Sequence, residues 1–172
     1  VGGILARLTA AMRVGGGGST AVADVGTNWA ILISGGINQQ NNDYAFWNDI
    51  GETYHILVNR YGYDPANVFV LFADGYPADP WNSISNCTGG VMGVCSNWTG
   101  PYAYPRNIVD YSATSAHLQA VCQYIADRDS PMDTLYVYMT DHGSGSSGYC
   151  MWGGEMITPL TFGSYVNLIN NI

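Results

Sequence analysis

The chain has 172 residues, of which 47% are apolar and only 10% charged, and its formal net charge is −8 with an isoelectric point near 4.3. This length is sufficient for one domain with a substantial core. Five Lys and Arg residues give no basic patch for nucleic acid or anionic lipid, and no apolar stretch is long enough to span a bilayer. We therefore exclude nucleic-acid binding and a membrane span.

Several features of the composition indicate an extracellular or cell-surface protein. Charged residues are well below the usual proportion of about a quarter, whereas Tyr and Gly are abundant, at 13 and 22 residues. Two Asn-x-Thr sequons predict glycosylation at Asn86 and Asn97. Four cysteines are consistent with an oxidising compartment.

Residues 1–26 differ from the rest of the chain. Residues 1–14 can form one or two helical turns with an apolar face, and the four glycines that follow are typical of a flexible linker. We interpret this segment as a flexible arm or a propeptide remnant, with docking on a neighbouring subunit as the alternative. No signal peptide is present, so we expect that the numbering begins after processing or that the chain is a fragment. Residues 27–172 are predicted to form one domain.

The domain begins with a predicted strand, helix and strand. The strand covers residues 29–33, and the two glycines after it allow a tight turn and the close approach of a ligand. The helix runs from residue 42 or 43 to residue 61, because apolar residues recur at helical spacing and Gly62 can end it. The second strand covers residues 68–72. Short connections predict a right-handed βαβ unit and an at least partly parallel sheet.

Residues 76–109 form a long segment rich in Pro, Gly, Asn and Ser, which predicts an insertion. Cys87 and Cys95 lie within it, and we predict a disulfide between them. Neither cysteine has a CxxC partner or a nearby histidine, so no metal site is expected. The aromatic residues of the insertion are expected to form a small local core, with stacking on a sugar as the alternative. They are Trp81, Trp98, Tyr102 and Tyr104.

A second helix and a third strand follow the insertion. The helix is predicted over residues 112–128, with Asp110 or Ser112 as its N-cap. The strand covers residues 135–139, and its dense bulky side chains without clean alternation predict burial on both faces. A hairpin over residues 149–157 and a helix capped by Thr158 complete the chain.

The turn after the third strand contains the candidate chemistry. Thr140-Asp141-His142-Gly143 leads into a run of Ser and Gly that is not expected to continue a strand. Catalytic groups of open α/β sheets lie at the carboxyl ends of the strands. A histidine placed there can transfer a proton, and the alternative is a loop histidine that caps the strand end.

Five motifs in a fixed order point to a known family. They are WAILISGG at 29–36, FWND at 46–49, YGYDP at 61–65, VFVLF at 68–72 before Asp74-Gly75, and YMTDHG at 138–143. Together they resemble the legumain-like cysteine peptidases of the caspase-like clan, in a secreted bacterial or archaeal form. The resemblance covers about residues 28–172, with the insertion as a private feature. It implies an α/β caspase-like three-layer sandwich with a mostly parallel sheet.

The resemblance also implies roles for four residues. The family's catalytic imidazole corresponds to His142, and the glycine amide of its oxyanion hole corresponds to Gly143. Asp141 matches the acidic residue before the histidine, and Asn38 is the nearest match to an asparagine that orients it. These residue types suit the chemistry, since a thiol needs a proton acceptor and a glycine amide can reach an oxyanion. No metal or cofactor is expected.

The family's nucleophile is a cysteine at the end of a later strand, and residue 172 lies within the helix that precedes that strand. Cys150 is placed in the hairpin, Cys122 on a core helix face, and the other cysteines in the insertion. We therefore expect no activity from this chain alone, and a peptide or protein substrate once a further segment completes it. The alternative is a non-catalytic extracellular structural or filament-forming glycoprotein that self-associates through an exposed sheet edge.

Overall fold

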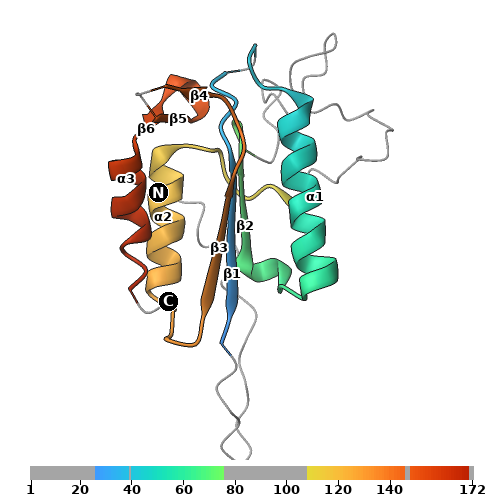
Figure 1. The fold of residues 1–172 in the computed structure, drawn as a ribbon, viewed down its shortest axis with the longest axis vertical. Helices are drawn as coiled ribbons and strands as arrows, with labels where there is room; N and C mark the ends of the chain where they lie inside the picture. The colour runs from blue at the N-terminus through green and yellow to red at the C-terminus, as the bar shows by residue number, and fades with distance from the viewer. Residues whose placement is uncertain (1–25, 39, 76–107, 146–147, 171–172) are drawn as a thin grey trace, which may run out of the picture.

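The described residues form three layers, with a sheet between helices (Figure 1). The computed structural model describes residues 26–38, 40–75, 108–145 and 148–170. The predictions for the N-terminal arm, most of the insertion, the Cys87–Cys95 disulfide and the two sequons lie outside these residues. The layered α/β architecture agrees with the fold expected from the sequence.

The central sheet has three parallel strands in the order β2-β1-β3. They are β1 (Asn28–Ser34), β2 (Val68–Phe72) and β3 (Thr134–Met139). Residues 30–33 of β1 have no exposed surface, because β1 lies between the other two strands and between helices. The three predicted strands and their parallel pairing are confirmed.

Helices cover both faces of the sheet. Helix α1 (Tyr44–Tyr61) packs on one face, and α2 (Ser115–Ala126) and α3 (Pro159–Val166) lie on the other (Figure 1). Alternate residues of β1 point to opposite faces, so the strand contributes to two separate cores. The α1 core includes Ala30, Leu32, Trp47, Ile50, Val70 and Phe72, and the α2/α3 core includes Trp29, Ile31, Ile33, Leu118, Val121 and Ile125. None of the described helices is long and apolar enough to cross a membrane.

The ends of α1 agree with the prediction. Asp43 is the N-cap, and its side chain accepts a hydrogen bond from the Ala45 amide. Gly62 ends the helix in the left-handed region at φ 71°, where its amide donates to the Leu57 carbonyl. Thr158 caps α3 as predicted, with Pro159 at the first helical position.

The predicted N-cap of α2 was wrong. Thr114 caps the helix, and its hydroxyl accepts a hydrogen bond from the His117 amide. Asp110 cannot take that role, because its amide donates to the Val70 carbonyl and its carboxylate accepts from the Val70 amide. The segment that contains Asp110 and Ser112 therefore runs beside β2 before the helix begins.

The prediction that the third strand is buried on both faces was also wrong. Every residue of β3 is at least partly exposed, and Tyr136 is 39% exposed. β3 forms one edge of the sheet among the described residues. The other edge is covered, since the Phe72 amide donates to the Tyr111 carbonyl and the Tyr111 amide to the Val70 carbonyl. The dense apolar residues of β3 therefore indicate an apolar surface, but they do not indicate which segment packs on that surface.

A second, small antiparallel sheet follows β3. It consists of β4 (Gly143–Ser144), β5 (Gly148–Cys150) and β6 (Met156–Ile157). The predicted hairpin is present as β5 and β6. β4 was not predicted, because two residues of a Gly/Ser run contain no apolar pattern. Gly148 has φ 114°, and a Cβ there would lie 2.3 Å from the Ile157 carbonyl oxygen, so a side chain is excluded at this crossing.

Candidate active site

The candidate site lies where the carboxyl ends of β1 and β3 meet, and Asp141 joins them. Its carboxylate accepts hydrogen bonds from the Ser34 hydroxyl at 3.0 Å and from the Gly36 amide. Its other oxygen accepts from the His142 amide at 2.6 Å. Burial raises the pKa of Asp141, although the hydrogen bonds from Gly36, His142 and Ser34 act in the opposite direction. Asp141 therefore fixes the backbone from which the His142 side chain projects.

The His142 imidazole is exposed and held from two sides. Its Nε2 lies 2.9 Å from the Asn41 carbonyl oxygen, and its ring meets Phe46 edge-on at 5.0 Å between centroids. A carbonyl can only accept a hydrogen bond, so Nε2 is the protonated nitrogen of the neutral ring. The lone pair is then on Nδ1, which has no hydrogen-bond partner among the described residues. Within the described part of the chain, the neutral form of His142 thus presents a basic nitrogen that accepts no hydrogen bond.

Gly143 directly follows His142 in the chain, and the pairing of β4 with β5 determines the direction of its backbone amide. In the β4–β5 ladder the Cys150 amide donates to the His142 carbonyl, so these two residues form a hydrogen-bonded pair. Bonded and non-bonded pairs alternate, and Gly143 opposite Tyr149 is the non-bonded pair. The Gly143 N–H therefore points away from β5. A Cβ built at Gly143 would have no described atom within 4 Å, so the side-chain position of this residue is open.

Asn38 acts at a distance from the imidazole. Its side-chain oxygen accepts hydrogen bonds from the Gln40 amide at 3.0 Å and from the Asn41 amide at 3.1 Å. It thereby shapes the loop whose Asn41 carbonyl receives His142, and no hydrogen bond joins Asn38 to the ring among the described residues. Sequence reasoning missed Asn41 because a backbone carbonyl leaves no residue-type pattern. In the sequence, Phe46 was noted only as part of the FWND motif at 46–49, with no role in the site.

The two described cysteines do not suit nucleophilic catalysis. Cys122 and Cys150 are free thiols and both are buried. Burial raises the pKa of Cys122 to about 11, and burial followed by the charge of Asp141 raises the pKa of Cys150. A reactive cysteine requires the opposite shift, towards the thiolate. Cys87 and Cys95 lie outside the described residues.

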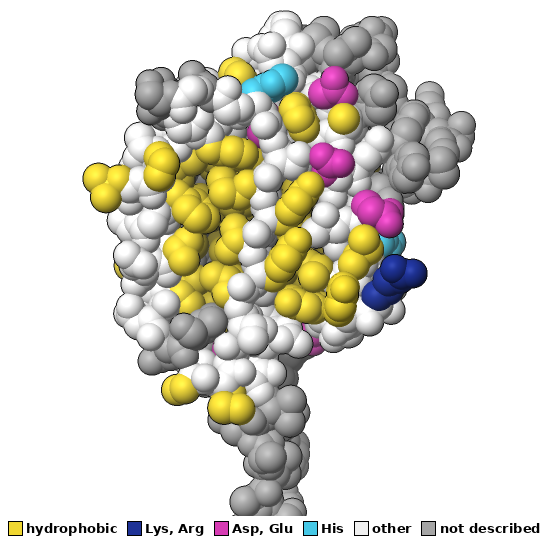
Figure 2. Space-filling model, in the orientation of Figure 1, with side chains coloured by type: hydrophobic (Ala, Val, Ile, Leu, Met, Phe, Trp, Pro, Cys, Tyr) yellow, Lys and Arg dark blue, Asp and Glu magenta, His cyan; other side chains and the backbone are white. Residues whose placement is uncertain are grey.

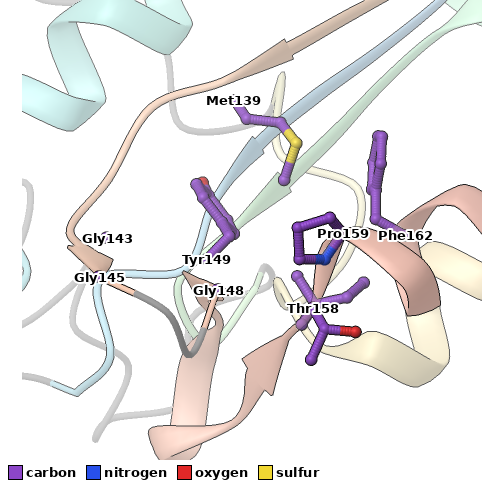
Figure 3. Close-up of a pocket in the computed structure, with 9 residues that line it drawn as sticks. Met139, Gly143, Gly145, Gly148, Tyr149, Thr158, Pro159 and Phe162 are labelled. Atoms are coloured by element: carbon purple, nitrogen blue, oxygen red, sulfur yellow. The ribbon is translucent and has the colours of Figure 1, made fainter.

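A cavity of about 360 Å³ lies beside Gly143. Figure 3 shows the side chains of Met139, Tyr149 and Phe162 around it, with Pro159 at one wall. Tyr149 is oriented by its hydroxyl, which lies 2.9 Å from the Ile33 carbonyl oxygen. The lining is mostly apolar. In the part of the chain that the structure describes, no group of three or more His, Cys, Asp or Glu residues is arranged to hold a metal ion.

Comparison with known proteins gives one distant similarity. No family model matches the sequence, and no solved structure matches. Legumain from Bos taurus is 27% identical over 133 residues, which cover 70% of this chain and 29% of legumain. The chain thus spans less than a third of the length of the relative that it matches. The chain is distantly legumain-like, and this similarity supports a cysteine-peptidase-like relationship.

Proposed function

We propose that this chain is the histidine-bearing part of a secreted legumain-like cysteine endopeptidase. The observation that supports the proposal is that His142 Nδ1 has no described hydrogen-bond partner and that the N–H of the next residue, Gly143, points away from β5, at the carboxyl end of a parallel sheet. Neither buried thiol of the described residues suits the reaction. Cys87 and Cys95 lie outside the described residues and are predicted to form a disulfide, so we propose that the nucleophile is a cysteine of a polypeptide segment other than residues 1–172.

The reaction proceeds through an acyl-enzyme. His142 Nδ1 takes the proton of the thiol, and the sulfur bonds to the carbonyl carbon of the scissile peptide. The oxyanion that forms accepts a hydrogen bond from the Gly143 amide. The C–N bond then breaks, and the leaving amine takes its proton from the imidazolium. Water hydrolyses the thioester, with His142 again as the base. Asp141 is a positioning residue, because it touches the backbone of His142 and not the reacting atoms.

The extracellular setting is part of the same proposal. A disulfide between Cys87 and Cys95 and glycans at Asn86 and Asn97 remain predictions from the sequence. Intact-mass measurement of the native protein before and after glycosidase and reductant reports both.

The Gly143→Ala variant of the complete polypeptide tests the proposed oxyanion site. A methyl group at this position meets no described atom, so folding should be unchanged, but the methyl group lies beside the amide and crowds an oxyanion that approaches it. We expect kcat/KM for peptide cleavage to fall by about 10²-fold. Gly163→Ala is the matched control, since it also adds a methyl into open space but on α3. Equal activity of the two variants would contradict the assignment of Gly143.

A second candidate function is a non-catalytic extracellular structural or filament-forming role. One observation favours it, namely the edge of β3, which no described segment covers and which another chain could pair with.

A further inference from the structure

The Tyr149 hydroxyl contacts the backbone at the carboxyl ends of both β1 and β3. Its oxygen lies 2.9 Å from the Ile33 carbonyl oxygen and 3.1 Å from the Thr140 carbonyl oxygen. A hydroxyl has one proton to donate, so the two carbonyls share it. Because Tyr149 lies in β5, a single side chain connects this small sheet to the ends of two strands of the central sheet.

The same hydroxyl oxygen also accepts a hydrogen bond, from the Gly35 backbone amide. Burial, followed by the charge of Asp141, raises the pKa of Tyr149, and the Gly35 hydrogen bond acts in the opposite direction. The hydroxyl therefore keeps its proton at neutral pH. It remains a donor to the two carbonyls and an acceptor for Gly35 under the conditions in which a peptidase would be assayed.

These contacts are on the two chain segments that hold the His142 imidazole. Thr140 comes two residues before His142, and Gly35 comes before the loop whose Asn41 carbonyl lies beside Nε2. His142 itself is exposed, and Figure 2 shows a histidine side chain on the surface at the upper end of the molecule, towards which the strands run in Figure 1. Tyr149 thus connects the segment that carries the ring to the segment that carries its hydrogen-bond partner.

A second contact is needed because Asp141 fixes this segment at one point only. The Asp141 carboxylate holds the amide of His142, which leaves the preceding peptide groups able to rotate about it. The Thr140 amide donates to the Ile33 carbonyl, and Tyr149 adds a contact at the Thr140 carbonyl. With the carbonyl of residue 140 and the amide of residue 142 both held, the backbone from which the imidazole projects has a single course.

We propose that Tyr149 is a positioning residue for His142, and that its hydroxyl sets the location of the base in the peptidase reaction. The inference rests on the proposed function and adds to it a residue of the β5–β6 hairpin. Tyr149 acts through the backbone and touches neither the imidazole nitrogens nor a substrate.

The Tyr149→Phe variant of the complete polypeptide that contains residues 1–172 tests this role. The ring is kept and only the hydroxyl is lost. We expect kcat for peptide cleavage to fall by about tenfold and KM to stay within about twofold, because the base is misplaced while the substrate contacts are unchanged. Nitrogen-15 NMR of the His142 ring, assigned by its absence in His142→Ala, should change from the Nε2-protonated tautomer to a mixture of both tautomers.

Two further variants separate positioning from folding. Tyr165→Phe is the matched control, since its hydroxyl lies 2.9 Å from the Ser115 hydroxyl and connects α3 to α2. It should lower the urea midpoint as Tyr149→Phe does and leave kcat and the His142 tautomer unchanged. Tyr149→4-aminophenylalanine puts an N–H donor in place of the O–H. It should keep kcat within about threefold of the wild-type value, and it decides the question if Tyr149→Phe does not fold.

The results that overturn the inference differ from those that overturn the proposed function. Wild-type kcat and tautomer in Tyr149→Phe, an equal loss of kcat in Tyr165→Phe, or a tenfold loss in a folded 4-aminophenylalanine variant excludes the positioning role. The proposed function fails instead if His142→Ala cleaves peptides as well as the wild type. In that case the His142 tautomer still reports whether Tyr149 positions the ring.

Discussion

Replacing His142 with alanine in the complete polypeptide is expected to lower kcat/KM for peptide cleavage by at least about 10³-fold. The imidazole is exposed, and Nδ1, which has no hydrogen-bond partner in the described residues, is the group that we assign as the base. The Asp141 bond to the residue 142 amide remains in the variant, so the backbone should keep its course. Steady-state kinetics with a peptide substrate measures the loss, and the free energy of unfolding should change by less than about 0.5 kcal/mol.

His117→Ala is the control for this experiment. His117 Nδ1 lies 2.8 Å from the Ser112 hydroxyl, and its ring stacks on Tyr111 at 5.4 Å, near the N-terminus of α2. We expect this variant to lose stability through the disturbed helix start and to keep its activity. If the His117 and His142 variants lose activity to the same extent, His142 has no special role in the chemistry.

Asp133→Asn is expected to lower the free energy of unfolding by about 3 kcal/mol. Asp133 is 7% exposed, and its carboxylate connects the start of β1 to the start of β3. It accepts hydrogen bonds from the Thr27 amide at 2.7 Å, the Trp29 indole at 2.9 Å and the Ser130 hydroxyl at 2.8 Å. An amide has one oxygen in place of two, and its NH₂ would face donors. Urea denaturation measures the change.

The matched control is Asp127→Asn. Asp127 is exposed, and its carboxylate accepts one hydrogen bond, from the Gln123 side chain at 2.8 Å. A loss below about 0.5 kcal/mol is expected there. Equal losses for Asp133 and Asp127 would show that the buried hydrogen-bond network does not stabilise the fold.

The same network gives stability a defined pH dependence. Burial acts to raise the pKa of Asp133, but hydrogen bonds from Thr27, Trp29 and Ser130 outweigh it and leave the pKa below its ordinary value. The folded pKa is therefore lower than the unfolded pKa of about 3.9. The stabilisation that the Asp133 carboxylate provides is complete above the unfolded pKa and is lost as the pH falls through the folded pKa. The pKa of Asp141 is shifted in the opposite direction, upward. The difference in the free energy of unfolding between wild type and Asp133→Asn therefore isolates the contribution of Asp133. This difference should become smaller as urea denaturation is repeated from neutral pH to below pH 4.

The elements of the fold could be predicted because local chemistry determines them. Apolar runs identified β1, β2 and β3, and Asp43, Gly62 and Thr158 marked helix ends through capping chemistry that acts within a few residues. The N-cap of α2 was misplaced because Asp110 is engaged with Val70, forty residues earlier in the chain. A pairing at that separation leaves no local pattern in the sequence.

The candidate site was only partly predictable for the same reason. His142 was predicted from its residue type and its position after a strand, and the role of Gly143 was predicted from the resemblance to the legumain-like family; both roles stay predictions. The direction of the Gly143 amide depends on the register of β4 with β5, and the protonated nitrogen of His142 depends on the Asn41 carbonyl. Both are products of tertiary structure. The partial exposure of β3 was not predicted, because a sequence pattern indicates an apolar surface but not which segment packs on it.

The most direct test of the central claim is to identify the cysteine that reacts with a peptide-based electrophile. The complete polypeptide that contains residues 1–172 would be treated with a peptidyl acyloxymethyl ketone, digested, and searched by mass spectrometry for the modified thiol. We predict modification of a cysteine other than the four in this sequence, and its loss in His142→Ala. Modification at Cys87, Cys95, Cys122 or Cys150, or labelling that does not depend on His142, would contradict the account.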